Sequence, residues 1–122
     1  MVFRDTKEIN EHNRLITALV KHLMSKGYNV SADHIGYPNG KPDEWKGQRA
    51  DIYAEKGEKK IFIEAETCGT IESKETKVQW VTLSSKEGVD FGIIIPQRCE
   101  KKAKEKAEQW GVELDAIWTM DT

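Results

Sequence analysis

The stretch from Val89 to Ile95, VDFGIII, is the most apolar run of the chain, and Pro96 follows it. A short run that is apolar at almost every position predicts a buried strand at the centre of a sheet. Residues 71–86 before it predict a helix, so this strand should return parallel to an earlier strand, residues 59–66, through that helix. The chain should therefore form an α/β domain. The helix is expected to turn four apolar residues inward: Ile71, Val78, Val81 and Leu83.

The first part of the chain predicts a helix and then a strand. Asp5 or Thr6 can cap a helix that runs to about Lys26, because apolar residues recur there at helical spacing. Gly27 then supplies the stop signal expected at a helix C-terminus. Residues 28–37 predict a strand, and the polar loop that follows is rich in turn-forming residues.

The remaining elements complete a mixed sheet. Residues 49–56 and 59–66 flank Gly57-Glu58, which predicts a tight hairpin. Near the C-terminus, residues 99–111 predict a charged helix and residues 112–120 a last strand. The expected order of elements is α-β-β-β-α-β-α-β, in one domain that spans the whole chain.

Composition excludes few classes of function. The 122 residues suffice for one core, and a formal net charge of −2 neither attracts nor repels nucleic acid, so a binding face must come from local pattern. No apolar run is long enough to span a membrane, and the N-terminus lacks a signal-peptide core, which predicts a cytoplasmic protein. Cys68 and Cys99 are isolated in the sequence, so two reduced thiols are expected rather than a zinc site.

Three acidic residues are predicted to meet at one end of the hairpin. Glu64 and Glu66 are two positions apart on a strand, so their side chains share a face, roughly 6–7 Å apart. Asp51 and Glu64 are equally far from Gly57-Glu58, which places them opposite each other. A hard divalent cation with oxygen ligands, Mg²⁺ or Mn²⁺, would relieve the repulsion among these carboxylates. The alternative is a strand end that emerges into solvent.

The segment 49–66, RADIYAEKGEKKIFIEAE, has a helix before it and a helix and strand after it. This pattern resembles the PD-(D/E)xK nuclease superfamily, which includes restriction endonucleases, Holliday-junction resolvases and RecB-type exonuclease domains. The resemblance covers about residues 6 to 96. It implies a restriction-endonuclease-like core of order αβββαβ, to which the C-terminal helix and strand are additions.

The resemblance assigns roles to four neighbouring residues. Asp51 matches the metal-binding Asp of the family, with Ala50 where a proline often stands. Glu64 matches the second acid, and the carbonyl of Ala65 would add a backbone metal ligand. Glu66 departs from the usual Lys and gives the E-x-E variant found in some restriction enzymes. A glutamate can bind a second metal or accept a proton from water, but it cannot donate a hydrogen bond to the scissile phosphate.

Other candidates come from the neighbouring helices. Lys74 or Lys77 could restore the missing positive charge, and Gln79 follows Glu66 at the interval at which RecB-like nucleases place a glutamine. Family members often place an acid of the first helix at the metal, which makes Glu11 a candidate ligand; a solvated polar face is the alternative.

Two histidines are interpreted differently. His12 lies near the apolar stripe of the first helix and is interpreted as a packed or capped histidine rather than a ligand. His34 stands near the end of a predicted strand and is interpreted as polar surface, with a place in the site as the alternative.

The loop before the hairpin combines an aromatic residue with basic and polar ones. Such a loop beside the proposed site is a candidate nucleic-acid contact, and a tryptophan packed back on the sheet is the alternative. The candidate nucleic-acid-binding residues are Lys41, Trp45, Lys46, Gln48, Arg49 and, on the next helix, Lys74.

The leading hypothesis is a metal-dependent DNA endonuclease or exonuclease that uses Mg²⁺ or Mn²⁺, either as a homodimer or as a subunit of a larger system. Its predicted catalytic residues are Asp51, Glu64, Glu66, Lys77 and Gln79. Two alternatives stay open. One is a catalytically inactive module of the same fold that binds nucleic acid or a protein partner, and the other is a small α/β module with no nucleic-acid role.

Overall fold

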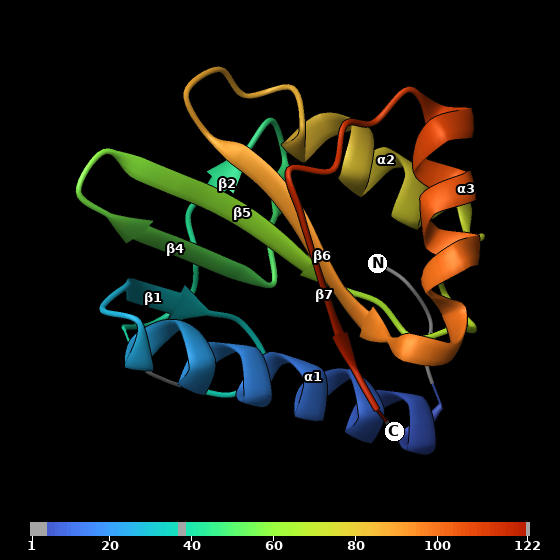
Figure 1. Cartoon of the computed structure of the whole chain (residues 1–122), viewed down its shortest axis with the longest axis horizontal. Coiled ribbons are helices and arrows are strands. Elements are labelled where there is room, and N and C mark those ends of the chain that lie inside the picture. The colour runs from blue at the N-terminus through green and yellow to red at the C-terminus, as the bar shows by residue number, and fades with distance from the viewer. Residues whose placement is uncertain (1–4, 37–38, 122) are drawn as a thin grey trace.

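A computed structural model describes residues 5–36 and 39–121 as a mixed α/β fold, with a five-stranded sheet and three α-helices (Figure 1). The strands lie in the order β1-β4-β5-β6-β7, and a separate two-stranded hairpin, β2-β3, lies beside them. In chain order the elements are α1 (Thr6–Ser25), β1 (Asn29–Ala32), β2 (Glu44–Trp45), β3 (Gln48–Arg49), β4 (Ile52–Lys56), β5 (Lys59–Ala65), α2 (Lys74–Leu83), β6 (Asp90–Pro96), the 3-10 turn η1 (Gln97–Cys99), α3 (Glu100–Trp110) and β7 (Ala116–Met120).

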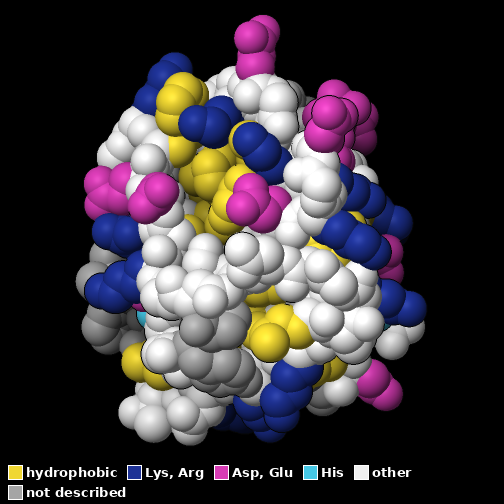
Figure 2. Space-filling model, turned by 90° about the vertical axis from the view of Figure 1, so that its left-hand side faces the viewer, with side chains coloured by type: hydrophobic (Ala, Val, Ile, Leu, Met, Phe, Trp, Pro, Cys, Tyr) yellow, Lys and Arg dark blue, Asp and Glu magenta, His cyan; other side chains and the backbone are white. Residues whose placement is uncertain are grey.

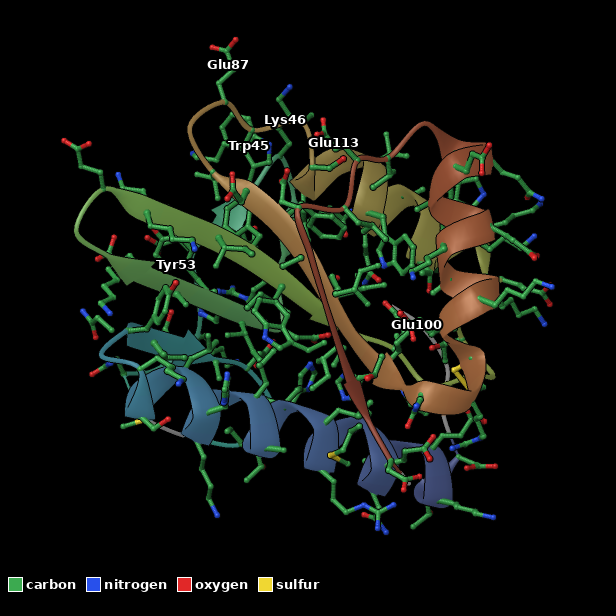
Figure 3. The ribbon with its side chains drawn as sticks, viewed as in Figure 1. Trp45, Lys46, Tyr53, Glu87, Glu100 and Glu113 are labelled. Carbon is green, nitrogen blue, oxygen red and sulfur yellow. A yellow bond between two sulfur atoms is a disulfide. The ribbon has the colours of Figure 1, made fainter. Side chains whose placement is uncertain are left out.

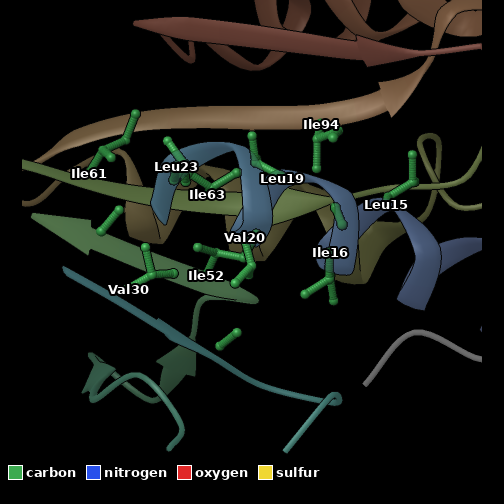
Figure 4. Close-up of a cluster of buried hydrophobic side chains, with 13 residues drawn as sticks. Leu15, Ile16, Leu19, Val20, Leu23, Val30, Ile52, Ile61, Ile63 and Ile94 are labelled. Carbon is green, nitrogen blue, oxygen red and sulfur yellow. The ribbon is translucent and has the colours of Figure 1, made fainter. Parts of the chain in front are cut away.

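Helix α1 forms where its capping and apolar signals predict it. The Asp5 carboxylate accepts a hydrogen bond from the backbone N–H of Glu8, and Gly27 takes the left-handed conformation just after the helix. Its apolar stripe packs on strands β1, β4, β5 and β6, and each fully buried aliphatic side chain contributes about 1.5–3 kcal/mol (Figure 4). The buried residues of the stripe are Leu15, Ile16, Leu19, Val20 and Leu23. Among the described residues, no helix is long and apolar enough to cross a bilayer.

The β4–β5 hairpin has the predicted register. Ile52 pairs with Ile63 and Lys56 with Lys59, with Gly57 at positive φ in the turn. Strand β6 pairs parallel to β5, as predicted, and β7 pairs parallel to β6. The carboxyl ends of β5, β6 and β7 therefore lie at one edge of the sheet, and Glu64 and Glu66 at the end of β5 lie at this edge.

Helix α2 covers the sheet face opposite α1, and only part of the prediction for its inward residues is confirmed. Ile71, just before the helix, and Leu83 are buried, as predicted. Val78 and Val81, predicted to face inward, are 51% and 42% exposed. Within the helix, Thr76 and Trp80 face inward together with Leu83. The prediction for Val78 and Val81 was wrong because it followed apolar character, whereas this helix is held through a threonine and a tryptophan that reach a buried carboxylate.

Several boundaries differ from the predictions. The helix predicted over 71–86 is limited to Lys74–Leu83, and the last strand, predicted over 112–120, to Ala116–Met120. The predicted strand 28–37 is limited to Asn29–Ala32, and its last position, Tyr37, lies outside the described residues. The region predicted as a polar loop contains the β2-β3 hairpin. The strand predicted from Arg49 begins at Ile52, because Arg49 belongs to β3.

Cys68 and Cys99 form a disulfide, so the expectation of two reduced thiols was wrong. Cysteines that are isolated in the sequence can still be neighbours in the fold. Since β5 and β6 are parallel neighbours, the segments that leave their carboxyl ends start side by side, and these segments carry the two cysteines 5.7 Å apart between Cα atoms. The bond joins the turn after β5 to η1.

Breaking this disulfide should lower the stability of the fold. It closes a loop with a sequence separation of 31 residues, for which loss of chain entropy in the unfolded state predicts about 3–4 kcal/mol. We expect the double variant Cys68→Ala, Cys99→Ala to lose that amount in urea unfolding. Wild type in a dithiol reductant should lose a similar amount, and the reductant should not affect the double variant. Equal stability of oxidised and reduced wild type would contradict the prediction.

Candidate metal centre

Side chains from four elements converge where the β4–β5 hairpin meets α1. Asp51 directly precedes β4, and Glu64 lies near the end of β5. His12 projects from α1, and His34 follows β1. The register that pairs Ile52 with Ile63 places Asp51 opposite Glu64, as the sequence predicts.

The carboxylate of Asp51 is the centre of this group. Its Oδ2 atom accepts a hydrogen bond from the N–H of Ala65 at 2.9 Å and lies 3.2 Å from Nε2 of His12. Its Oδ1 atom lies 3.2 Å from Nε2 of His34. Burial favours the neutral acid, but the hydrogen bonds with His12 and His34 outweigh it and hold the pKa of Asp51 well below its ordinary value. Asp51 is therefore ionised.

Glu64 has the opposite electrostatics. Its side chain is fully buried, and its Oε2 atom accepts a hydrogen bond from the backbone N–H of Asp51 at 3.0 Å. Burial raises the pKa of Glu64, and the negative charges of Asp51 and then Glu66 raise it further. Without a cation the pair therefore holds one charge, on Asp51, and one proton, on Glu64.

His12, His34 and Asp51 form a group that could hold a metal ion, since one ligand atom from each lies within 4.8 Å of the others. His12 is buried, whereas the side chain of His34 is 45% exposed and lies at the open side of the group. The donor set, one ionised carboxylate and two imidazoles, suits a divalent cation, and so does the neighbouring Glu64, which burial and the charge of Asp51 keep neutral.

His12 was not predicted as a candidate ligand, and His34 was given a place in the site only as the alternative. His12 does occupy the inward stripe of α1, as predicted, but the stripe meets Asp51 at that point. His34 takes a left-handed backbone conformation, with φ of 74°, which a strand pattern does not reveal. No local signal in the sequence places His12 beside Asp51, because the two residues are 39 positions apart.

Glu66 lies on the other side of the group, against α2. Its Oε1 atom accepts hydrogen bonds from the hydroxyls of Thr70 at 2.7 Å and Thr76 at 3.4 Å. Its Oε2 atom accepts one from the indole N–H of Trp80 at 3.3 Å. The side chain is fully buried, so this carboxylate links the end of β5 to the inner face of α2.

The other predicted metal and catalytic residues are more scattered. Ala65 contributes its backbone N–H to Asp51. Glu11 forms an ion pair with Arg98 at 3.1 Å. Lys77 is exposed, and Gln79 is half-buried. Side chains two positions apart on a helix point in directions about 160° apart, so Lys77 and Gln79 do not face one phosphate together.

Two cavities divide the predicted nucleic-acid residues. Gln48 and Lys74 line a small one of about 210 Å³, together with Gln79. Lys41 lines a larger one of about 570 Å³ beside Lys60, on the outer part of the sheet. On the side shown in Figure 2, hydrophobic side chains lie in a hollow with both basic and acidic side chains around it.

The tryptophan of the loop is packed rather than free. Trp45 is half-buried against the core, and the ammonium groups of Lys46 and Lys86 lie 5.2 and 4.0 Å from the centre of its ring (Figure 3). The indole N–H of Trp45 is buried and has no hydrogen-bond partner in the described part of the chain. Arg49 pairs with Glu44 at 3.3 Å. The predicted nucleic-acid residues that line cavities are thus divided between two of them.

Comparisons with protein-family models, with curated proteins and with solved structures found no match to this chain. Its function must therefore be inferred from the residues and their geometry.

The charge state of Glu64 predicts an unusual pH dependence of stability. Because its pKa is raised, the native state binds more protons than the unfolded state above the ordinary Glu value, so the free energy of unfolding falls as pH rises through that range. Glu64→Gln removes this loss. In the presence of a chelator, we expect the variant to exceed wild type by about 1 kcal/mol or more at pH 8 and to match it near pH 4.

Urea unfolding at the two pH values measures this difference. Glu58→Gln, the same change in the exposed turn of the same hairpin, is the matched control and should follow wild type. A Glu64→Gln variant that is less stable than wild type at pH 8 would show that the buried glutamate is ionised and stabilising.

Proposed function

We propose that the chain is a metal-dependent phosphodiesterase that acts on DNA. The observation that carries the proposal is the convergence of His12, His34 and Asp51, with Glu64 paired to Asp51 across the hairpin. Divalent cations at such carboxylate sites are a standard means of phosphodiester hydrolysis. Mg²⁺ and Mn²⁺ are the first ions to test.

The architecture agrees with this proposal. Leaving out the small β2-β3 hairpin, the order α1-β1-β4-β5-α2-β6 is the αβββαβ order expected of a restriction-endonuclease-like core. The inserted hairpin directly precedes Asp51, and α3 and β7 extend the core at its C-terminal end. We propose this core as the fold, with the site at the mouth of the β4–β5 hairpin.

The residues of the site can bind the ion and release a proton. A bound divalent cation supplies an activated hydroxide and positive charge opposite the phosphorane-like transition state. Asp51, already ionised, and the imidazoles of His12 and His34 would hold it. Burial and the negative charge of Asp51 raise the pKa of Glu64, and the positive charge of the ion would oppose both effects. Glu64 would therefore lose its proton as the ion binds. Metal binding should therefore release protons.

Glu66 has a positioning role in this proposal. Both of its carboxylate oxygens accept hydrogen bonds from the side of α2, which favours support of the site over the role of base or of ligand to a second metal. It fixes α2 to the end of β5. That helix carries Lys74 and Gln79, which line the small cavity with Gln48 and are the candidates for contact with the DNA phosphate.

Cleavage should depend on the paired acids. We expect nicking or degradation of duplex, single-stranded or branched DNA with Mn²⁺ or Mg²⁺, and a loss of at least about 100-fold in Asp51→Asn and Glu64→Gln. Both changes remove charge with little change of shape. Glu58→Gln is the control and should keep full activity. If wild type binds DNA but cleaves none of these substrates, the catalytically inactive binding module becomes the better account.

Substitutions of Glu66 separate a positioning role from a catalytic one. Glu66→Lys, although closer to the family pattern, would bury a cation among three hydrogen-bond donors and should cost about 3–5 kcal/mol in urea unfolding. Glu66→Gln keeps an acceptor and should cost about 1–2 kcal/mol. It should lose less than about tenfold in Mn²⁺ affinity, the smallest loss expected for a group that directly supports a ligand. A larger loss in a folded Gln variant would make Glu66 part of the metal site.

A further inference from the structure

We propose that His34, together with His12, makes the site selective for a first-row transition-metal ion over Mg²⁺. The ion would be of the class that accepts imidazole ligands, with Mn²⁺ as its weakest member and Co²⁺ and Zn²⁺ above it. This inference rests on the metal site of the proposed function, but not on DNA cleavage. It assigns to His34 the choice of metal.

The geometry fits two imidazoles on one ion. Each Nε2 atom lies 3.2 Å from a different oxygen of Asp51. Two ligands held about 2.1 Å from one ion lie about 3.0 Å apart when adjacent and about 4.2 Å apart when opposite. All three ligand atoms fall within 4.8 Å of one another, so shifts of about half an ångström would complete the coordination.

The two rings are arranged to present nitrogen rather than to stack. Their planes are 81° apart, with centroids at 5.1 Å, in an edge-on arrangement. Both nitrogens that face inward are Nε2 atoms, and both approach the same carboxylate. His12 gives the buried side of the site and His34 the exposed side, where an ion and its water ligands can enter.

The backbone around His34 holds it in this position. The N–H of Asp33 donates to the carbonyl of Asp51 at 2.9 Å and continues the β1–β4 pairing by one residue. The Asp33 side chain then accepts a hydrogen bond from the N–H of His34 at 2.9 Å. His34 itself has φ of 74°, a left-handed conformation that is strained for a residue with a Cβ. Glycine would fit this backbone better, so the imidazole serves its side-chain contact.

The ligand chemistry sets the selectivity. Mg²⁺ takes oxygen ligands in near-ideal octahedral geometry and keeps several waters, so a neutral nitrogen ligand adds little to its affinity. Imidazole binds transition-metal ions, with affinity that rises from Mn²⁺ towards Cu²⁺. A site made only of carboxylates would lack this nitrogen-dependent preference. The share of selectivity that depends on His34 is therefore the quantity to measure.

The test is calorimetric titration of the protein with MnCl₂, CoCl₂ or MgCl₂ alone, without DNA. His34→Asn removes the imidazole and keeps a residue that tolerates left-handed backbone. His22→Asn, which removes an exposed imidazole from α1, is the matched control. We expect His34→Asn to weaken Mn²⁺ and Co²⁺ binding at least about tenfold and to change Mg²⁺ binding less than about threefold. His22→Asn should change neither.

A second measurement needs no variant. Pulsed electron paramagnetic resonance of the wild type with Mn²⁺ should show coupling to two imidazole nitrogens. A Mn²⁺-to-Mg²⁺ affinity ratio that is the same in His34→Asn and His22→Asn, or spectra without nitrogen coupling, would overturn the inference. Absence of metal binding would overturn the metal centre as well. Intact selectivity without cleavage of any DNA would overturn only the phosphodiesterase.

Discussion

The hydrogen bonds of the Asp51 carboxylate are the interactions on which the rest of the site depends. The β4–β5 register brings the backbone N–H of Asp51 to Glu64, and the Oδ2 atom of Asp51 to the N–H of Ala65. Its two oxygens then reach His12 of α1 and His34 beyond β1. One ionised group thus links a helix, a hairpin and an edge strand. Since a buried charge is tolerated only when hydrogen bonds surround it, the same contacts that define the site also hold these elements together.

The three acids of the hairpin tolerate one another because each has a different environment. Asp51 keeps its charge through two imidazoles, and Glu64 avoids a second charge by keeping its proton. Glu66 accepts hydrogen bonds from two hydroxyls and an indole N–H. Three adjacent carboxyl groups therefore do not mean three equivalent metal ligands. Asp51 contacts the two histidines with which it could hold a cation, and Glu64 accepts a hydrogen bond from the backbone N–H of Asp51.

The register of the site could be predicted from the sequence, but its composition could not. Positions equidistant from Gly57-Glu58 pair in a tight hairpin, so simple counting placed Asp51 beside Glu64. His12 and Asp51 are 39 residues apart, and no local pattern specifies where α1 crosses the sheet. His34 depends on a left-handed turn, which strand periodicity does not reveal. Helix α2 was misread for a related reason, because Trp80 turns inward to reach Glu66 as well as to fill the core.

The composition of α2 explains why position 66 has a glutamate, where the nuclease superfamily that the segment 49–66 resembles usually has a lysine. The groups that surround Glu66 are the hydroxyls of Thr70 and Thr76 and the N–H of Trp80. An indole N–H only donates, and a lysine ammonium only donates, so a lysine here would leave buried donors facing each other. A carboxylate satisfies them all. The helix that packs on Glu66 therefore explains why a glutamate stands there. If the chain is an enzyme, the positive charge that a lysine supplies in the nucleases it resembles would come from the bound cation or from residues such as Lys74, which line the neighbouring cavity.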